Sequence, residues 1–285
     1  MIPIAFDYVR PTTIPEAVAA LVASGEDGKI LAGGQSLMPV LRLRMAAPSV
    51  VIDCSEIADL QGVRDDGNSI VIGAGTTHHD VMNSPIVKEH SPLLAMATAT
   101  VADPAIRHRG TLGGALAHAD PAGDLPAVAL ALDGVLSVTG PNGSRDIAAA
   151  DFFTDYFTTS MAEDEILVSV TLPKLGAGWG YHYEKFQRTA QGWAIVGVAA
   201  AVHRSNGNIT AARIGLTNMA PSPVRASSVE TALSGADATV KAVGDAAASA
   251  ADGTRATSDL HAAADYREHL ARVITKRAVL TAGGI

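Results

Sequence analysis

The chain has 285 residues, of which 48% are hydrophobic and 18% charged, and its formal net charge is −8. This balance is ordinary for a globular protein and argues against a disordered chain. The acidic charge and the shortness of basic clusters, such as Arg107 with Arg109, also argue against a nucleic-acid-binding protein, which is expected to carry a basic face.

Cys54 is the only cysteine, and this limits both the cellular compartment and the metal sites that the chain can be expected to have. One thiol forms no intrachain disulfide, which suits a reducing compartment, and it cannot hold an iron–sulfur cluster or a thiolate zinc site. The opening residues lack the basic and apolar regions of a signal peptide, and the longest apolar stretch, near residues 194–202, is too short to span a bilayer. We therefore expect a cytoplasmic protein without a transmembrane segment.

Helix and strand signals mix in the first part of the chain. Thr13 and Glu16 form a capping box, and the helix that they begin carries a short apolar face and ends at Gly25. Next come three short strands rich in apolar and β-branched residues, each bounded by turn residues. They are predicted over residues 29–32, 50–53 and 69–73.

An Ala-rich helix is predicted over residues 92–102, and Asp103-Pro104 is expected to end or kink it. A glycine-rich segment follows at residues 110–114. The residues after it suit a buried helix over 125–132, and strands are predicted over 135–139 and 165–172.

The composition changes at residues 173–180, where a proline and three glycines indicate a domain boundary. Beyond it, strand patterns come first and helical patterns last. The strands are predicted over 181–187, 195–203 and 211–216, and the helices over 224–234, 239–251 and 260–280. This order indicates a composite α+β architecture.

Two glycine pairs are the strongest candidates for a binding site. The first lies in Leu31-Ala32-Gly33-Gly34-Gln35-Ser36-Leu37, directly after a predicted strand, and the second lies in Thr111-Leu112-Gly113-Gly114-Ala115. Glycine allows a ligand to approach the backbone closely, and successive N–H groups in such a turn bind anions such as a pyrophosphate. Paired glycines also occur in plain turns, so the pattern leaves both interpretations open.

Other sites are less well supported by the sequence. A Rossmann fingerprint is disfavoured, because His78 stands where the run from Gly73 would need its last glycine, and no P-loop motif occurs. His78 and His79 could suggest a metal site, but adjacent residues on a strand point to opposite faces. Neither Ser36 nor Ser160 has the setting of a hydrolase nucleophile. With no acid/base constellation evident, a bound cofactor could supply the chemistry.

At these glycine segments the chain closely resembles the FAD-binding medium subunits of molybdenum hydroxylases, a family that includes the flavoprotein subunit of carbon monoxide dehydrogenase. The resemblance rests on the two glycine motifs, on the run from Ala119 to Pro126, and on the lead-in from Val101 to Arg107. It spans nearly the whole chain.

The resemblance implies a two-part FAD-binding fold of the vanillyl-alcohol-oxidase type, followed by a smaller C-terminal α+β domain. The FAD-binding domain would cover residues 1–175, with subdomains at about 1–57 and 58–175, and the C-terminal domain residues 176–285.

The resemblance also implies the residues that bind FAD. Ala32 to Ser36 and Thr111 to Ala115 would surround the pyrophosphate, and Asp124 would hydrogen-bond the hydroxyl-bearing chain of the cofactor. The full set of expected FAD-binding residues is Ala32, Gly33, Gly34, Gln35, Ser36, Leu37, Val101, Ala102, Thr111, Leu112, Gly113, Gly114, Ala115, Asp124, Leu167 and Lys185.

Two positions depart from the family pattern. Ala115 stands where the family often has Asn or Ser, so a side-chain hydrogen bond is lost there. Trp193 stands where a tyrosine covers one face of the flavin in the carbon monoxide dehydrogenase subunit, which puts the access to the flavin in doubt.

By resemblance, electrons would pass from a molybdenum–pterin cofactor in a large subunit through two [2Fe–2S] clusters in a small subunit to FAD in this chain. They would then leave to an external acceptor, and the complex would be a dimer of heterotrimers. Two alternatives are a free-standing flavin-dependent oxidase of the same fold and a binding module that has lost FAD. The substrate cannot be inferred, because its pocket would lie in another subunit.

Overall fold

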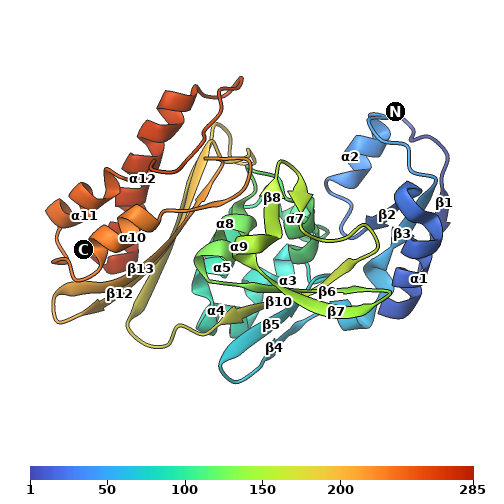
Figure 1. The fold of residues 1–285 in the computed structure, drawn as a ribbon, viewed down its shortest axis with the longest axis horizontal. Coiled ribbons are helices and arrows are strands. Elements are labelled where there is room, and N and C mark those ends of the chain that lie inside the picture. The colour runs from blue at the N-terminus through green and yellow to red at the C-terminus, as the bar shows by residue number, and fades with distance from the viewer.

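A computed structural model describes all 285 residues. The chain forms three regions in sequence order, each built on its own sheet (Figure 1). Helices and strands are mixed throughout, so the expected α+β class is confirmed. None of the helices combines the length and the apolar character needed to cross a bilayer.

The first region is a small parallel sheet with strand order β1-β3-β2. Helix α1 packs on it, and its N-terminus has the capping box that the sequence predicts, with Thr13 and Glu16 bonded reciprocally. Helix α2 begins after the first glycine pair. The elements are β1 (Asp7–Val9), α1 (Ile14–Ser24), β2 (Gly28–Leu31), α2 (Leu37–Arg42) and β3 (Val50–Asp53).

The second region is an antiparallel sheet with strand order β4-β5-β10-β6-β7, and helices cover one of its faces (Figure 1). Its strands are β4 (Val63–Asp65), β5 (Ser69–Gly73), β6 (Val135–Gly140), β7 (Gly143–Ala148) and β10 (Ile166–Pro173), with the small pair β8 (Phe153–Asp155) and β9 (Thr158–Thr159) beside them. Its helices are α3 (His78–Asn83), α4 (Pro85–His90), α5 (Pro92–Ala99), α6 (Pro104–Arg107), α7 (Leu112–His118), α8 (Asp124–Ala131) and α9 (Ala149–Phe152).

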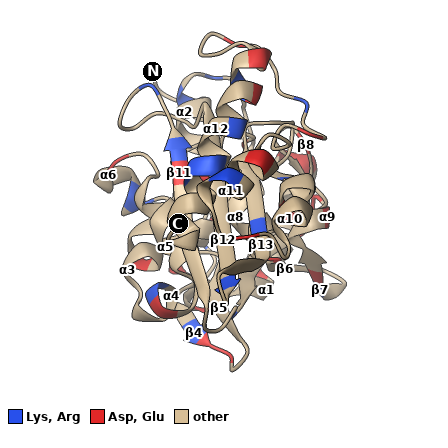
Figure 2. Cartoon of the chain, turned by 90° about the vertical axis from the view of Figure 1, so that its left-hand side faces the viewer, with Lys and Arg blue, Asp and Glu red and all other residues tan.

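The third region is an antiparallel sheet with strand order β11-β12-β13-β14. Three helices cover its outer face, in front of β12 and β13 in Figure 2, and α5 and α8 of the second region contact its strands. The strands are β11 (Trp179–Phe186), β12 (Val196–Ser205), β13 (Asn208–Thr217) and β14 (Val224–Arg225). The helices are α10 (Ser227–Leu233), α11 (Val240–Ala247) and α12 (Ala264–Gly283).

Helix α8 joins the second and third regions. All eight of its residues are buried, as expected for a helix that is enclosed on every side. A Cβ at Gly215 of β13 would lie 2.2 Å from the carbonyl oxygen of Ala127, so sheet and helix touch without intervening side chains. Thr217 Oγ1 donates to the Gly123 carbonyl at 3.1 Å. The two regions therefore share one continuous interior.

Three sequence expectations need correction. The helix predicted over 92–102 ends at Ala99, because Ala102 takes a left-handed conformation with φ 43°. The helix predicted from residue 224 begins at Ser227, since the two residues of β14 first pair with β13. The adjacent histidines lie on helix α3 and not on a strand, because Thr77 caps that helix by accepting from the N–H of Asp80.

Candidate cofactor-binding site

The two glycine segments lie in direct contact, although they come from the first and second regions of the fold. A Cβ at Gly33 would lie 2.1 Å from the carbonyl oxygen of Arg109 and 2.6 Å from Cα of Gly110. A Cβ at Gly113 would lie 2.4 Å from Cβ of Ala74. These two glycines are therefore required for the close approach of backbone to backbone, which no larger residue allows.

The two segments differ in their free hydrogen-bond donors. In the first, the backbone N–H groups of residues 33–36 have no acceptor in the chain, and Gly34 has φ 73°. In the second, the N–H groups of residues 112–115 are all paired: Leu112 with Thr76 O, Gly113 with Ala74 O, and Gly114 and Ala115 with Thr111. The first segment can thus hold an anion by its backbone, while the second supplies the support against which it packs.

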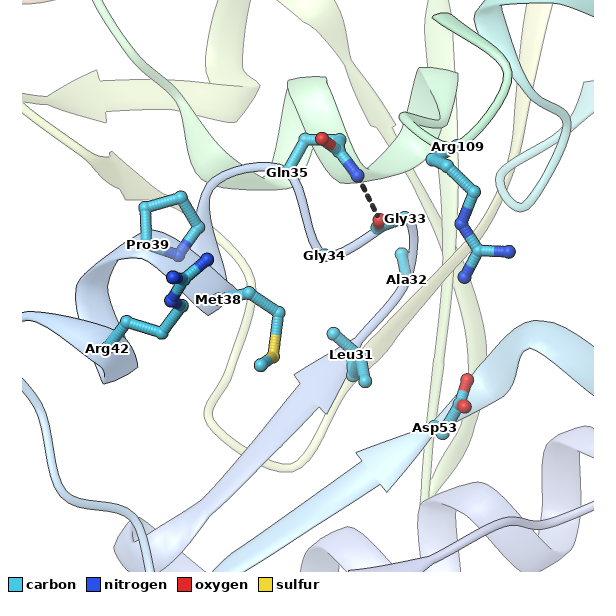
Figure 3. A pocket seen from close by; sticks show the side chains of 10 residues that line it. All are labelled: Leu31, Ala32, Gly33, Gly34, Gln35, Met38, Pro39, Arg42, Asp53 and Arg109. Atoms are coloured by element: carbon cyan, nitrogen blue, oxygen red, sulfur yellow. Dashed lines mark hydrogen bonds between the residues drawn. The ribbon is translucent and has the colours of Figure 1, made fainter. Parts of the chain in front are cut away.

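Two adjoining cavities flank the first glycine segment, with volumes of about 320 Å³ and about 290 Å³. Both are lined by Ala32, Gly33 and Arg109. The first also has Leu31, Gly34, Gln35, Met38, Pro39, Arg42 and Asp53 in its wall (Figure 3). The second lies between the first and second regions of the fold, and its wall includes Ile30, Cys54, Thr111, Gly113, Gly114 and Leu167.

Arg109 and Asp53 are site residues that the glycine motifs did not reveal. Arg109 lines both cavities and has no ion pair or side-chain hydrogen bond within the chain, and Asp53 faces it across the first cavity (Figure 3). Burial raises the pKa of Asp53, but hydrogen bonds from the Tyr8 hydroxyl and the Ser55 N–H outweigh it, so the pKa is lowered. A signal was available for Asp53, because it ends a parallel strand, where ligands of open α/β sheets bind.

A second cluster surrounds Asp124 and Lys185, which line neither cavity. Lys185 Nζ donates to Asp124 Oδ2 at 2.8 Å and to the Thr100 carbonyl at 3.1 Å, and the Tyr183 hydroxyl donates to Asp124 Oδ1 at 2.6 Å. The side chains of Asp124 and Lys185 are each only 4% exposed. The cluster therefore connects α8, β11 and the end of α5 just before Val101 and Ala102.

Comparisons with known proteins identify this arrangement. Residues 4–175 match the family described as the FAD binding domain in molybdopterin dehydrogenase, and residues 181–282 match the C-terminal domain of the carbon monoxide dehydrogenase flavoprotein. The carbon monoxide dehydrogenase medium chain of Hydrogenophaga pseudoflava is 40% identical over 98% of this chain and 97% of its own length. The nicotine 6-hydroxylase medium subunit of Paenarthrobacter nicotinovorans is 37% identical, with 98% of each chain covered.

Solved structures agree over the entire chain. Carbon monoxide dehydrogenase from Hydrogenophaga pseudoflava superposes with a TM-score of 0.97 at 42% identity, covering 100% of this chain and 99% of the other. Quinoline 2-oxidoreductase from Pseudomonas putida 86 gives a TM-score of 0.95 at 32% identity, with the same coverage. The chain belongs to the FAD-binding medium subunits of the molybdenum hydroxylases. The family resemblance and the two-part architecture expected from the sequence are thereby confirmed.

The remaining expected FAD-binding residues of this medium subunit take different positions. Ser36 and Leu37 follow the first glycine segment at the start of α2 but line neither cavity. Leu112 is 2% exposed and packs into the core of the second region, and Ala115 lies on the same helix, α7. Trp193 is 61% exposed, in the loop between β11 and β12, and lines neither cavity.

His78 is a buried histidine whose neutral form the folded state favours. Burial lowers the pKa of His78 to about 4, and the nearby Arg107 adds to this effect. Because the folded state favours the neutral ring, its contribution to stability is complete above the unfolded pKa near 6.5 and is lost as the pH falls from there towards 4. We expect the free energy of unfolding to fall by about 3 kcal/mol across this window from His78 alone.

The test of this expectation compares urea unfolding at pH 7 and pH 4.5 in the wild type and in His78→Phe. The substitution should remove most of the loss, while His261→Phe, a change at an exposed histidine, should leave it unchanged. An equal loss in the wild type and His78→Phe would show that other groups cause the acid sensitivity.

Proposed function

We propose that this chain receives electrons from [2Fe–2S] clusters of a small partner subunit into FAD held at the glycine segments, and passes them to an external acceptor. A large subunit with a molybdenum–pterin cofactor would oxidise the substrate. The complex would be a cytoplasmic dimer of heterotrimers.

The observation that carries the proposal is the unpaired donor set of the first glycine segment. Four successive N–H groups, at residues 33–36, have no acceptor in the chain, and the free guanidinium of Arg109 lies beside them. A pyrophosphate carries the negative charge and the acceptor oxygens that such a set binds. The walls of the second cavity are apolar at Ile30 and Leu167, which suits an aromatic ring system.

FAD, when bound, supplies the redox chemistry, because a flavin accepts electrons singly and releases them in pairs. The chain's own part is to bind and orient it. Ala32 to Ser36 would hold the pyrophosphate, with Thr111 to Ala115 as support, and Leu167 would pack on the cofactor. The proposal also assigns Asp124, Lys185, Val101 and Ala102 to FAD binding, in a cluster that lies outside the walls of the two cavities.

Names of the relatives point to different substrates. They include carbon monoxide, nicotine and quinoline, at 32–42% identity to this chain. Related flavin subunits therefore belong to enzymes of several chemistries, which supports a role confined to electron transfer. We propose that substrate choice lies in the large subunit.

The proposal predicts the identity of the flavin. The complex purified with its partner subunits should release FAD on denaturation, with no flavin left on the protein, because the free backbone donors of the first glycine segment bind a pyrophosphate without a covalent link. The supernatant is analysed by chromatography against FAD and FMN standards. Recovery of FMN, of covalent flavin or of no flavin at all would contradict the proposed function.

A further inference from the structure

Three consecutive backbone carbonyls, those of Thr100, Val101 and Ala102, each accept a hydrogen bond from a cationic side chain. Lys185 Nζ donates to the first at 3.1 Å. Arg107 Nη1 donates to the second at 2.7 Å and to the third at 3.2 Å. The Arg107 side chain forms no ion pair, and the Val101 and Ala102 carbonyls are its only hydrogen-bond acceptors.

This arrangement fixes the direction of the neighbouring N–H groups. In a trans peptide unit the N–H points away from the C=O of the same unit, and the chain has no cis peptide bonds. Because Arg107 holds the carbonyls of Val101 and Ala102, the N–H groups of Ala102 and Asp103 point away from the guanidinium. Neither N–H has an acceptor in the chain.

The backbone conformation at Ala102 shows that this orientation is imposed. Its φ of 43° is in the left-handed region, which costs a residue with a Cβ about 1–2 kcal/mol. No glycine stands there to remove the cost. The two hydrogen bonds from Arg107 offset it, since bonds to charged groups are stronger than those between neutral groups.

We propose that Arg107 is a positioning residue, which turns the N–H groups of Ala102 and Asp103 towards acceptor oxygens of the bound FAD. Lys185 fixes the preceding carbonyl and so prevents the segment from rotating as a whole. The inference rests on the proposed function, because it takes Val101 and Ala102 as FAD-binding residues.

The oxygens that these N–H groups meet have two sources in FAD, namely the pyrimidine carbonyls of the flavin ring and the phosphates. Reduction adds negative charge to the pyrimidine part of the ring but not to the phosphates. Donors to the ring therefore stabilise the reduced form more than the oxidised form, and donors to the phosphates stabilise both equally.

The test measures the FAD dissociation constant and midpoint potential of the flavin-depleted complex, reconstituted with FAD, for five variants and the wild type. Arg107→Met should weaken FAD binding at least about tenfold. Arg107→Lys keeps the charge, but its ammonium ends one bond short of the Nη1 position from which both carbonyls are reached, so it should lose nearly as much. Arg64→Met, a change at an exposed arginine on β4 without an ion pair, serves as the control and should bind like the wild type.

Rescue separates positioning from a general loss of structure. Glycine adopts positive φ without strain, so Ala102→Gly added to Arg107→Met should recover part of the lost affinity, with Ala102→Gly alone as its reference. If the donors meet the flavin ring, Arg107→Met weakens the binding of reduced FAD more than that of oxidised FAD. Its midpoint potential then falls by about 30 mV for each tenfold difference between the two losses of affinity. If they meet a phosphate, the affinity falls and the potential stays.

Unchanged FAD affinity in Arg107→Met would overturn the inference. So would an Arg107→Lys variant that binds FAD like the wild type, or a double variant, Ala102→Gly with Arg107→Met, that binds FAD no better than Arg107→Met. Either of the last two results would show that Arg107 acts by its charge alone or through stability. A wild-type complex that binds no FAD would instead refute the proposed function.

Discussion

Gly33→Ala should abolish FAD binding and lower the free energy of unfolding by about 3 kcal/mol, the upper part of the usual range for overpacking. The added Cβ would lie 2.1 Å from the Arg109 carbonyl oxygen and 2.6 Å from Cα of Gly110. Both neighbours are backbone atoms, so the two glycine segments must separate. The N–H groups of residues 33–36 would then move away from Arg109.

Flavin content after desalting and thermal unfolding measure the two effects. Gly244→Ala is the matched control, because its Cβ would meet only the mobile end of Lys276 at 3.3 Å. It lies within helix α11, where alanine is favoured over glycine by about 0.5–1 kcal/mol. Gly33→Ala with full flavin and wild-type stability would show that the segments do not pack as the structure has them.

Asp124→Ala should lower the free energy of unfolding by about 3–5 kcal/mol, because it leaves one charge of a buried pair without its partner. Lys185 would keep only the Thr100 carbonyl, and the Tyr183 hydroxyl would lose its acceptor. Burial raises the pKa of Asp124, and the Lys185 ammonium opposes that rise. The size of the loss reflects the desolvated ammonium more than the strength of the pair.

The double variant Asp124→Leu with Lys185→Met distinguishes two roles of this cluster. Apolar replacement of both partners is often neutral for stability, so most of the loss should be recovered in urea unfolding. If Asp124 also bonds a hydroxyl of FAD, both the single and the double variant should bind FAD more weakly than the wild type. A single variant within about 1 kcal/mol of the wild type would be incompatible with a buried ion pair.

Elements with strong local signals could be predicted from the sequence. The capping box at Thr13 and the apolar runs of β3 and β5 appear where the patterns place them. The end of the helix predicted over 92–102 could not, because Ala102 takes a left-handed conformation that alanine does not favour. The helix that carries the two histidines had a signal in the sequence, since Thr77 and Asp80 form an N-terminal cap.

The sequence indicates both glycine segments as candidate binding loops, but it does not indicate how their hydrogen bonding differs. Both glycine pairs look alike in the sequence, yet only the first keeps free N–H groups, because Thr76, Ala74 and Thr111 accept those of the second. Arg109 reaches the cavities through the packing of Gly33 against its own backbone. Such contacts between distant segments leave no local pattern.

Reduction of the flavin under anaerobic rapid mixing tests the central claim most directly. A substrate oxidised by the complex is mixed with the complex and, separately, with the isolated chain supplied with FAD, while the visible flavin absorbance is followed. The account predicts rapid bleaching in the complex and none in the isolated chain, because the proposed function places the clusters and the substrate site in partner subunits. Rapid bleaching of the isolated chain would contradict it and indicate a free-standing flavin oxidase.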